Sequence, residues 1–129
     1  MQIHEQKLTV TKDHLDVRQH VNNVHYVQWV QDIAEAHWLL KSSEVIRSDY
    51  YWVMVSHHIQ YKAQAILGDL LVLKTFVTKS QGVRSTRIVE IYNATTKQLL
   101  TSSETIWCFM SHDTNKPTRI PESINTLFS

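Results

Sequence analysis

Residues 14–29, HLDVRQHVNNVHYVQW, place titratable and amide side chains directly before a stretch with helical periodicity. Asp16 and His20 lie four positions apart and are followed by the pair Asn22 and Asn23. Apolar residues then recur at helical spacing, so we expect a helix to begin at about Asn23. The first turn of a helix has free backbone N–H groups and the positive end of the helix dipole, which can stabilise a developing oxyanion. The pattern therefore favours chemistry at a carbonyl group.

This stretch resembles the signature of the hotdog-fold acyl thioesterases. These include bacterial acyl-CoA thioesterases of the 4-hydroxybenzoyl-CoA thioesterase type and plant fatty acyl-ACP thioesterases. Their pattern runs roughly Asp-x-Asp-x-x-Gly/Gln-His-Val-Asn-Asn-x-x-Tyr and continues into an amphipathic helix. The positions that match it in order and spacing are Asp16, Gln19, His20, Val21, Asn22, Asn23 and Tyr26, while His14 replaces the first Asp. The resemblance implies an acyl-CoA or acyl-ACP substrate.

The resemblance also implies catalytic roles. Asp16 matches the carboxylate that, in the bacterial enzymes, attacks the thioester or deprotonates the attacking water, and the sequence leaves both routes open. Asn23 matches the position whose backbone N–H polarises the thioester carbonyl, although its side chain is also a candidate helix cap. His20 matches a histidine that orients substrate or water in the plant enzymes, with a packed structural histidine as the alternative. Arg18 and Gln64 replace an Asn and a Glu of the plant pattern, so the simpler Asp-centred mechanism fits better.

Four further residues are candidates for substrate binding. Asn22 lies at the expected helix start, where it is also a candidate N-cap. Tyr26 falls on the apolar stripe of the helix, so a core position is its alternative role. His57 and Tyr61 share one face of a predicted strand and are expected to line an acyl pocket. Glu35, farther along the helix, is the backup candidate for the catalytic carboxylate.

The hydrophobic periodicity predicts one long helix and about five strands. The helix is expected to follow an N-cap at Asn22 or Asn23 and to end around residues 41–43, with Gln28, Gln31, Asp32 and Glu35 on its polar face. The segments with strand-like composition and alternation are 3–10, 52–65, 70–79, 83–93 and 99–110. A sheet that curls around the helix buries its apolar stripe, so we expect an α+β hotdog fold, which the resemblance also implies.

Three further expectations concern the second strand, the C-terminal segment and the positively charged strand residues. If side chains alternate strictly along the second strand, one face carries the odd-numbered residues, namely Val53, Val55, His57, Ile59, Tyr61 and Ala63. The segment with Pro117 and Pro121 is expected to run irregularly along the surface. The strand cations that could meet coenzyme A phosphates are expected to be an ordinary solvated face, and none is assigned as a binder: Lys62, Lys79, Arg84 and Arg87.

Composition narrows the class of protein. A chain of 129 residues that is 43% hydrophobic fits one domain, residues 1–129. With 13 Lys and Arg against 12 Asp and Glu, the net charge is too small to attract the chain strongly to nucleic acid or to an anionic membrane. The single cysteine, the lack of a signal-peptide pattern and the lack of a long apolar run predict a cytoplasmic protein. The eight histidines show no zinc-site spacing, so neither a metal nor another cofactor is expected.

A single helix and sheet would leave one side of the helix and the sheet edges uncovered. We therefore expect a homodimer or a dimer of dimers (a homotetramer), and the resemblance implies active sites between subunits. The leading functional hypothesis is hydrolysis of an acyl thioester, most simply acyl-CoA, in fatty acid metabolism. The alternatives are hydroxyacyl-thioester dehydration on the same fold and non-catalytic binding of acyl thioesters.

Overall fold

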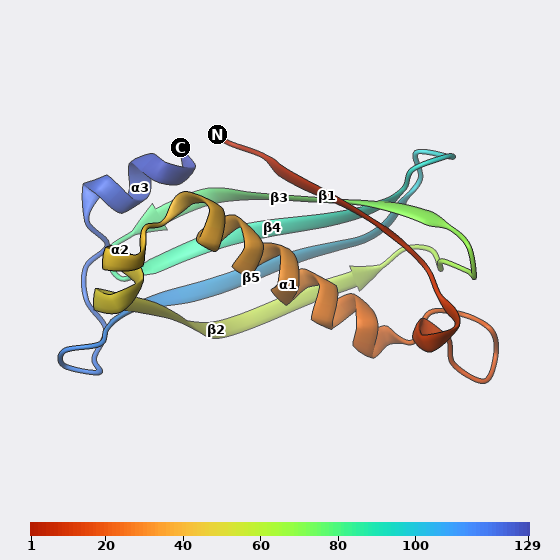
Figure 1. The fold of residues 1–129 in the computed structure, drawn as a ribbon, viewed down its shortest axis with the longest axis horizontal. Helices are drawn as coiled ribbons and strands as arrows, with labels where there is room; N and C mark the ends of the chain where they lie inside the picture. Colours follow the sequence, from red (N-terminus) through yellow and green to blue (C-terminus); the bar gives the residue numbers. More distant parts are fainter.

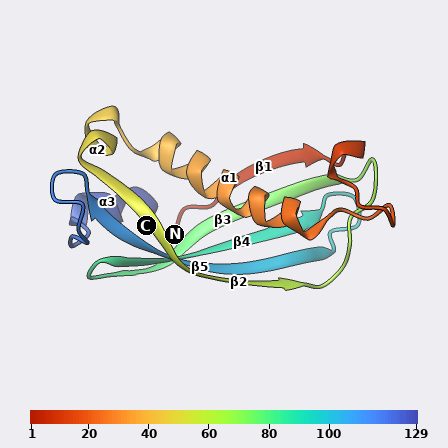
Figure 2. The same cartoon turned by 90° about the horizontal axis from the view of Figure 1, so that it is seen from below.

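A computed structural model describes all residues 1–129 and contains one long helix against a curved antiparallel sheet (Figure 1). The elements in chain order are β1 (His4–Thr9), the 3-10 turn η1 (Lys12–His14), α1 (Asn23–Lys41), α2 (Glu44–Asp49), β2 (Tyr50–Tyr61), β3 (Leu70–Gln81), β4 (Arg84–Asn93), β5 (Leu99–Ser111) and α3 (Glu122–Phe128). The strand order is β1-β3-β4-β5-β2, and every neighbouring pair is antiparallel. Figure 2 shows α1 lying along one face of the curved sheet. The predicted α+β hotdog fold is confirmed.

The ends of α1 are fixed by local capping. At the start, Asn22 Oδ1 accepts a hydrogen bond from the Val24 N–H at 3.2 Å, which satisfies one of the free donors of the first turn. At the other end, the Ser42 N–H and hydroxyl both donate to the Trp38 carbonyl oxygen, and α1 stops at Lys41. Both boundaries agree with the prediction. No helix has the length and apolar character that crossing a membrane requires.

The main core lies between α1 and the inner face of the sheet. Val30 and Ile33 of α1 are completely buried there. Their partners on β3 and β4 have the same inward parity and include Leu71, Leu73, Val89 and Ile91. The polar face of α1 predicted from the sequence, with Gln28, Gln31, Asp32 and Glu35, is exposed. The amphipathic pattern therefore orients α1 on the sheet.

The alternation predicted for the second strand is wrong in its first half. The register of β2 on β5 shifts between Met54 and Ser56, so Val55 is an extra residue that reverses the alternation. Val53 and Val55 are 44% and 45% exposed. His57, beyond the bulge, pairs with the buried Thr105 and keeps the inward orientation that was predicted for it.

The C-terminal segment also differs from the prediction. It runs irregularly through both prolines, as expected, but then forms α3, which begins directly after Pro121. Ile120, Ile124 and Phe128 are spaced four residues apart and are buried in a second cluster with Phe109. This helical spacing is the sequence signal that could have indicated α3, and the prediction did not use it. The short helix α2 was not predicted either.

Candidate active site

The loop between η1 and α1 folds back on itself and brings the motif residues together. The Asp16 N–H donates to the His20 carbonyl oxygen at 2.8 Å, and the Asn22 N–H donates to the His14 carbonyl oxygen at 2.9 Å. Gln19 has a φ of +64°, a left-handed conformation that turns the chain between the two paired segments. Asp16 and His20 are therefore neighbours immediately before the start of α1.

The two carboxylate oxygens of Asp16 have different environments. Oδ1 accepts hydrogen bonds from the backbone N–H groups of Arg18 at 2.8 Å and His20 at 3.2 Å. Oδ2 has no hydrogen-bond partner, and the side chain is only half-buried. One oxygen thus holds the carboxylate in place, while the other is free to attack a carbonyl carbon or to take a proton from water.

The first residue of α1, seven positions after Asp16 in the chain, supplies a free backbone donor. Asn23 is exposed, and its N–H makes no hydrogen bond to the protein. The Asn22 side chain is engaged as the N-cap, and the half-buried His20 ring has no hydrogen bond. The free Asn23 N–H at the positive end of the helix dipole is the kind of donor that stabilises an oxyanion.

Tyr26 supports this loop from within the core. It is 1% exposed, and its hydroxyl oxygen accepts a hydrogen bond from the Ala65 N–H at 3.0 Å. The Ala65 carbonyl oxygen in turn accepts from the Val21 N–H, which ties the loop to the connection between β2 and β3. Burial raises the pKa of Tyr26, so it stays protonated. Its position matches the core role, and the predicted contact with substrate stays a prediction.

We expect Tyr26→Phe to lower the free energy of unfolding by about 1–3 kcal/mol, because the Ala65 N–H would remain buried without an acceptor. Tyr61→Phe is the matched control, since the Tyr61 hydroxyl makes no hydrogen bond and the residue is 42% exposed. Denaturant unfolding of both variants and the wild type measures the difference. An equal loss of stability in the two variants would contradict the role assigned to the Tyr26 hydroxyl.

His57 and Tyr61 lie on the inward face of β2, opposite Thr105 and Thr101 of β5. The His57 Nε2 atom is buried and has no hydrogen-bond partner. Burial, with a smaller effect of His58, lowers the pKa of His57, so its ring is neutral at pH 7. Both residues are thus on the side of the sheet that faces α1, as predicted, and their contact with an acyl group stays a prediction.

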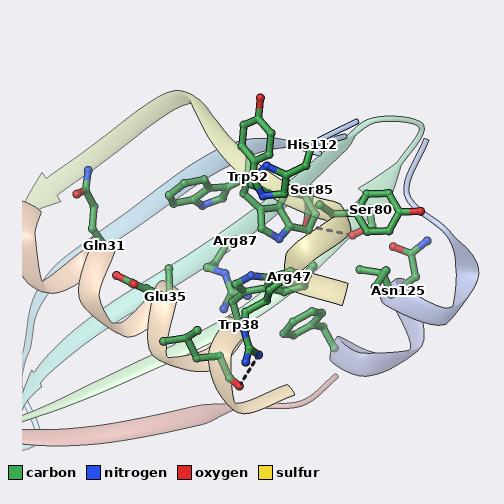
Figure 3. Close-up of a pocket in the computed structure, with 18 residues that line it drawn as sticks. Gln31, Glu35, Trp38, Arg47, Trp52, Ser80, Ser85, Arg87, His112 and Asn125 are labelled. Carbon is green, nitrogen blue, oxygen red and sulfur yellow. Dashed lines mark hydrogen bonds between the residues drawn. The ribbon is translucent and has the colours of Figure 1, made fainter. Parts of the chain in front are cut away.

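A cavity of about 420 Å³ lies at the other end of α1 (Figure 3). It is enclosed by the second half of α1, α2, α3 and the adjoining parts of the sheet. Aromatic rings form much of its wall, namely Trp38, Tyr50, Trp52, Trp107 and Phe128. Glu35, the backup carboxylate, also lines it, whereas Asp16 and the other predicted site residues do not.

The cavity and Asp16 of the same chain lie far apart. Asn23 begins α1 and Trp38 lies fifteen residues later. At 1.5 Å per residue, the helix separates them by about 22 Å. Figure 1 shows the same separation, with the loop before α1 at one end of the molecule and α2 and α3 at the other.

Arg87 reaches this cavity from β4 and was not predicted to be there. It is 6% exposed, so its assignment to a solvated face is wrong. Its Nη1 donates to Thr75 Oγ1 at 3.0 Å and to His37 Nδ1 at 2.9 Å. Burial lowers the pKa of His37 to about 4, and the positive charge of Arg87 makes a smaller contribution to this decrease. His37 is therefore neutral, and its Nδ1 accepts the hydrogen bond from Arg87. Arg87 lies two residues before the buried Val89 on β4, so both side chains are on the inward face of the sheet. This alternation is the sequence signal that could have predicted the burial of Arg87.

The sequence profile of the thioesterase-like superfamily matches residues 10–128. This chain belongs to that superfamily. Among curated proteins, this thioesterase-like chain is similar to a chloroplastic acyl-[acyl-carrier-protein] hydrolase of Cuphea viscosissima, with 26% identity over 86 residues. The match covers 65% of this chain but only 20% of that protein, so the chain corresponds to about a fifth of the relative's length.

Solved structures of thioesterases share the fold. A 1,4-dihydroxy-2-naphthoyl-CoA thioesterase from Synechocystis has a TM-score of 0.83 and 20% identity, covering 98% of this chain and 95% of that one. A probable thioesterase from Escherichia coli has a TM-score of 0.82 and 23% identity, covering 95% and 94%. A 12:0-ACP thioesterase from Umbellularia californica has a TM-score of 0.84 and 15% identity, covering 98% of this chain and 51% of that one. At these identities the likeness establishes the hotdog fold.

Proposed function

We propose that this protein hydrolyses an acyl thioester, most simply an acyl-CoA, to a free carboxylic acid and a thiol. The observation that carries the proposal is the pairing of Asp16 with the start of α1. Asp16 has one carboxylate oxygen held by two backbone N–H groups and one oxygen free, and the Asn23 N–H at the start of α1 has no partner. A nucleophile or base beside an oxyanion donor is what acyl transfer to water requires. Membership of the thioesterase-like superfamily supports the same reaction.

In this mechanism, the thioester carbonyl oxygen accepts a hydrogen bond from the Asn23 N–H. By the first route, Asp16 Oδ2 attacks the carbonyl carbon, the C–S bond breaks, and water hydrolyses the resulting anhydride. By the second, Asp16 takes a proton from water, whose oxygen attacks the carbonyl carbon before the C–S bond breaks. Either way the thiolate leaves and takes up a proton. His20 would orient the substrate or the water.

The proposed site is completed by a second copy of the chain. Strand β2 is a free edge of the sheet, so the β2 strands of two copies can pair antiparallel and continue the sheet. A two-fold axis perpendicular to the sheet then places the two α1 helices side by side and antiparallel. The aromatic cavity at the end of one α1 would therefore face Asp16 of the other copy. This arrangement overcomes the separation of about 22 Å within one chain.

We expect light scattering at low micromolar concentration to give twice or four times the chain mass of 15.1 kDa. The free β2 edge and the exposed polar face of α1 are the surfaces that the second copy would cover. Activity should fall with the dimer fraction on dilution, because each site needs both copies. A folded monomer with full activity would contradict the shared site.

The reaction is tested by thiol release from short, medium, long and aromatic acyl-CoAs, with acyl-ACPs alongside. Thiol release from at least one of them supports the proposal, and the preferred acyl group and carrier define the substrate. A preference for long aliphatic chains would place the enzyme in fatty acid metabolism. Conversion of a hydroxyacyl-CoA to the enoyl thioester without thiol release would instead indicate a dehydratase. Binding without any turnover would indicate a non-catalytic acyl-thioester protein.

A further inference from the structure

The aromatic cavity contains a buried guanidinium group without a negative partner. Arg87 is 6% exposed, and only its Nη1 donates hydrogen bonds, both to neutral acceptors on His37 and Thr75. Its Nε and Nη2 have no acceptor in the protein. The only ion pair in the structure joins Lys74 and Glu5, whose strand positions adjoin Thr75 and His4 but have the opposite parity, so the pair lies on the other face of the sheet.

A buried cation of this kind is costly unless an anion or several acceptors compensate it. Burial lowers the pKa of Arg87 only to about 10, so it remains charged at pH 7. Arg47 also lines the cavity, and its Nη1 donates to the carbonyl oxygens of Ser42 and Leu39 and to the Ser42 hydroxyl, not to a carboxylate. With Glu35 as the only acidic residue in the lining, the cavity carries an excess of positive charge.

The two free donor positions of Arg87 are adjacent on one edge of the guanidinium. Nε and Nη2 together form the side-on fork that binds both oxygens of a carboxylate. Figure 3 shows Arg87 and Arg47 among the residues that surround the cavity, with Arg87 coming from β4 and Arg47 from α2. The remaining wall is largely aromatic, which suits an apolar body, and a volume of about 420 Å³ is within the range of small-molecule sites.

We propose that this cavity holds the acyl group of the substrate and that Arg87 binds a carboxylate at the end of the acyl group distant from the thioester. The preferred substrate class is thus an acyl thioester with a terminal carboxylate and an apolar middle. The assignment of the bound group as an acyl group rests on the proposed thioesterase function. The presence of a carboxylate-binding site at Arg87 rests on the cavity alone.

A purely structural role is the competing explanation for Arg87. The guanidinium lies over the Phe128 ring at 5.5 Å, so Arg87 also contributes to the packing of α3. If that were its whole role, Arg87→Met would change stability but not the ligand preference. The test must therefore compare an anionic ligand with a neutral ligand of the same shape.

Titration calorimetry with octanoate and octanamide tests the carboxylate site without any turnover. We expect the wild type to bind octanoate roughly 10- to 100-fold more tightly, as expected for a charge-assisted bidentate contact. Arg87→Met should lose this preference, and Arg87→Lys should keep only part of it, because lysine retains the charge without the fork. Circular dichroism verifies folding. Equal binding of both ligands by the wild type, or an unchanged preference in Arg87→Met, would overturn the proposal. If Arg87→Met does not fold, the proposal is judged from the preference of the wild type for octanoate over octanamide and from the decrease of this preference in Arg87→Lys.

A hydrolysis assay is the second test of the proposal. Suberoyl-CoA and octanoyl-CoA have acyl chains of equal length that end in a carboxylate and a methyl group, respectively. We expect kcat/KM to favour suberoyl-CoA in the wild type and the ratio to fall by roughly 10- to 100-fold in Arg87→Met. A ratio that Arg87→Met leaves unchanged would overturn the assignment of the acyl group to this cavity. If the wild type hydrolyses no thioester, the proposed function fails, while the calorimetric result still decides whether Arg87 is a carboxylate site.

Discussion

Replacing Asp16 with asparagine is expected to reduce the rate of thioester hydrolysis by ~10²–10⁴, the usual loss when a positioned acid–base group is removed. The side-chain amide oxygen of asparagine can still accept the Arg18 and His20 N–H hydrogen bonds that hold the loop. The loop should therefore keep its shape while the group that replaces Oδ2 can neither attack a carbonyl nor accept a proton. Steady-state thiol release with the best acyl-CoA of the panel measures the loss.

Asp13→Asn is the matched control for this substitution. Asp13 is an exposed carboxylate in η1, three residues before Asp16, and it makes no side-chain hydrogen bond. The same change of charge at this position should leave the rate close to that of the wild type. If Asp16→Asn retains more than about a tenth of the wild-type rate, Asp16 is not the catalytic carboxylate. Glu35→Gln would then be the next variant to assay.

Asn23→Pro is expected to reduce kcat by ~10²–10³, because it removes the backbone N–H assigned to the oxyanion. The structure suits this substitution. The Asn23 N–H has no hydrogen bond to lose, and proline is well tolerated at the first position of a helix. Asn22, the preceding residue, has φ −67° and ψ 136°, an extended conformation that a following proline permits.

Asn23→Ala separates the backbone from the side chain. Alanine keeps the N–H, and Asn22 rather than Asn23 provides the cap, so this variant should retain most of the activity. Both variants are compared by kcat after circular dichroism and light scattering show folded dimers. Equal losses in Ala and Pro would mean that the Asn23 side chain matters and that the backbone assignment is wrong.

The parts of the fold and site that local sequence determines were predictable. The helical stripe and the asparagine pair located α1 and its N-cap, because capping and amphipathic burial depend on residues close together in the chain. The order of Asp16, His20 and Asn23 likewise located the loop before α1. The hydrogen bonds that fix Asp16 Oδ1 were not predictable, because they depend on the turn at Gln19.

What the sequence did not reveal depends on contacts between distant segments. The bulge at Val55 changes which residues of β2 face inward, and alternation alone contains no signal for an extra residue. Arg87 is buried because α1 and α3 cover that part of the sheet. Its charge suggested exposure, whereas its place in the strand alternation, two residues from the buried Val89, indicates the inward face. The aromatic cavity is built from elements across the chain and has no counterpart in any single motif.

The most direct test of the central claim is to follow both products of the wild-type enzyme in ¹⁸O-labelled water over many turnovers. The proposal predicts that thiol and carboxylic acid form in equal amounts and that each acid molecule carries one oxygen from the solvent. Both routes through Asp16 give this result over many turnovers, because water either adds its oxygen to the acyl group directly or replaces an Asp16 oxygen that has passed to the acid. Recovery of every acyl-CoA and acyl-ACP unchanged from folded, dimeric protein would contradict the assignment of thioester hydrolysis.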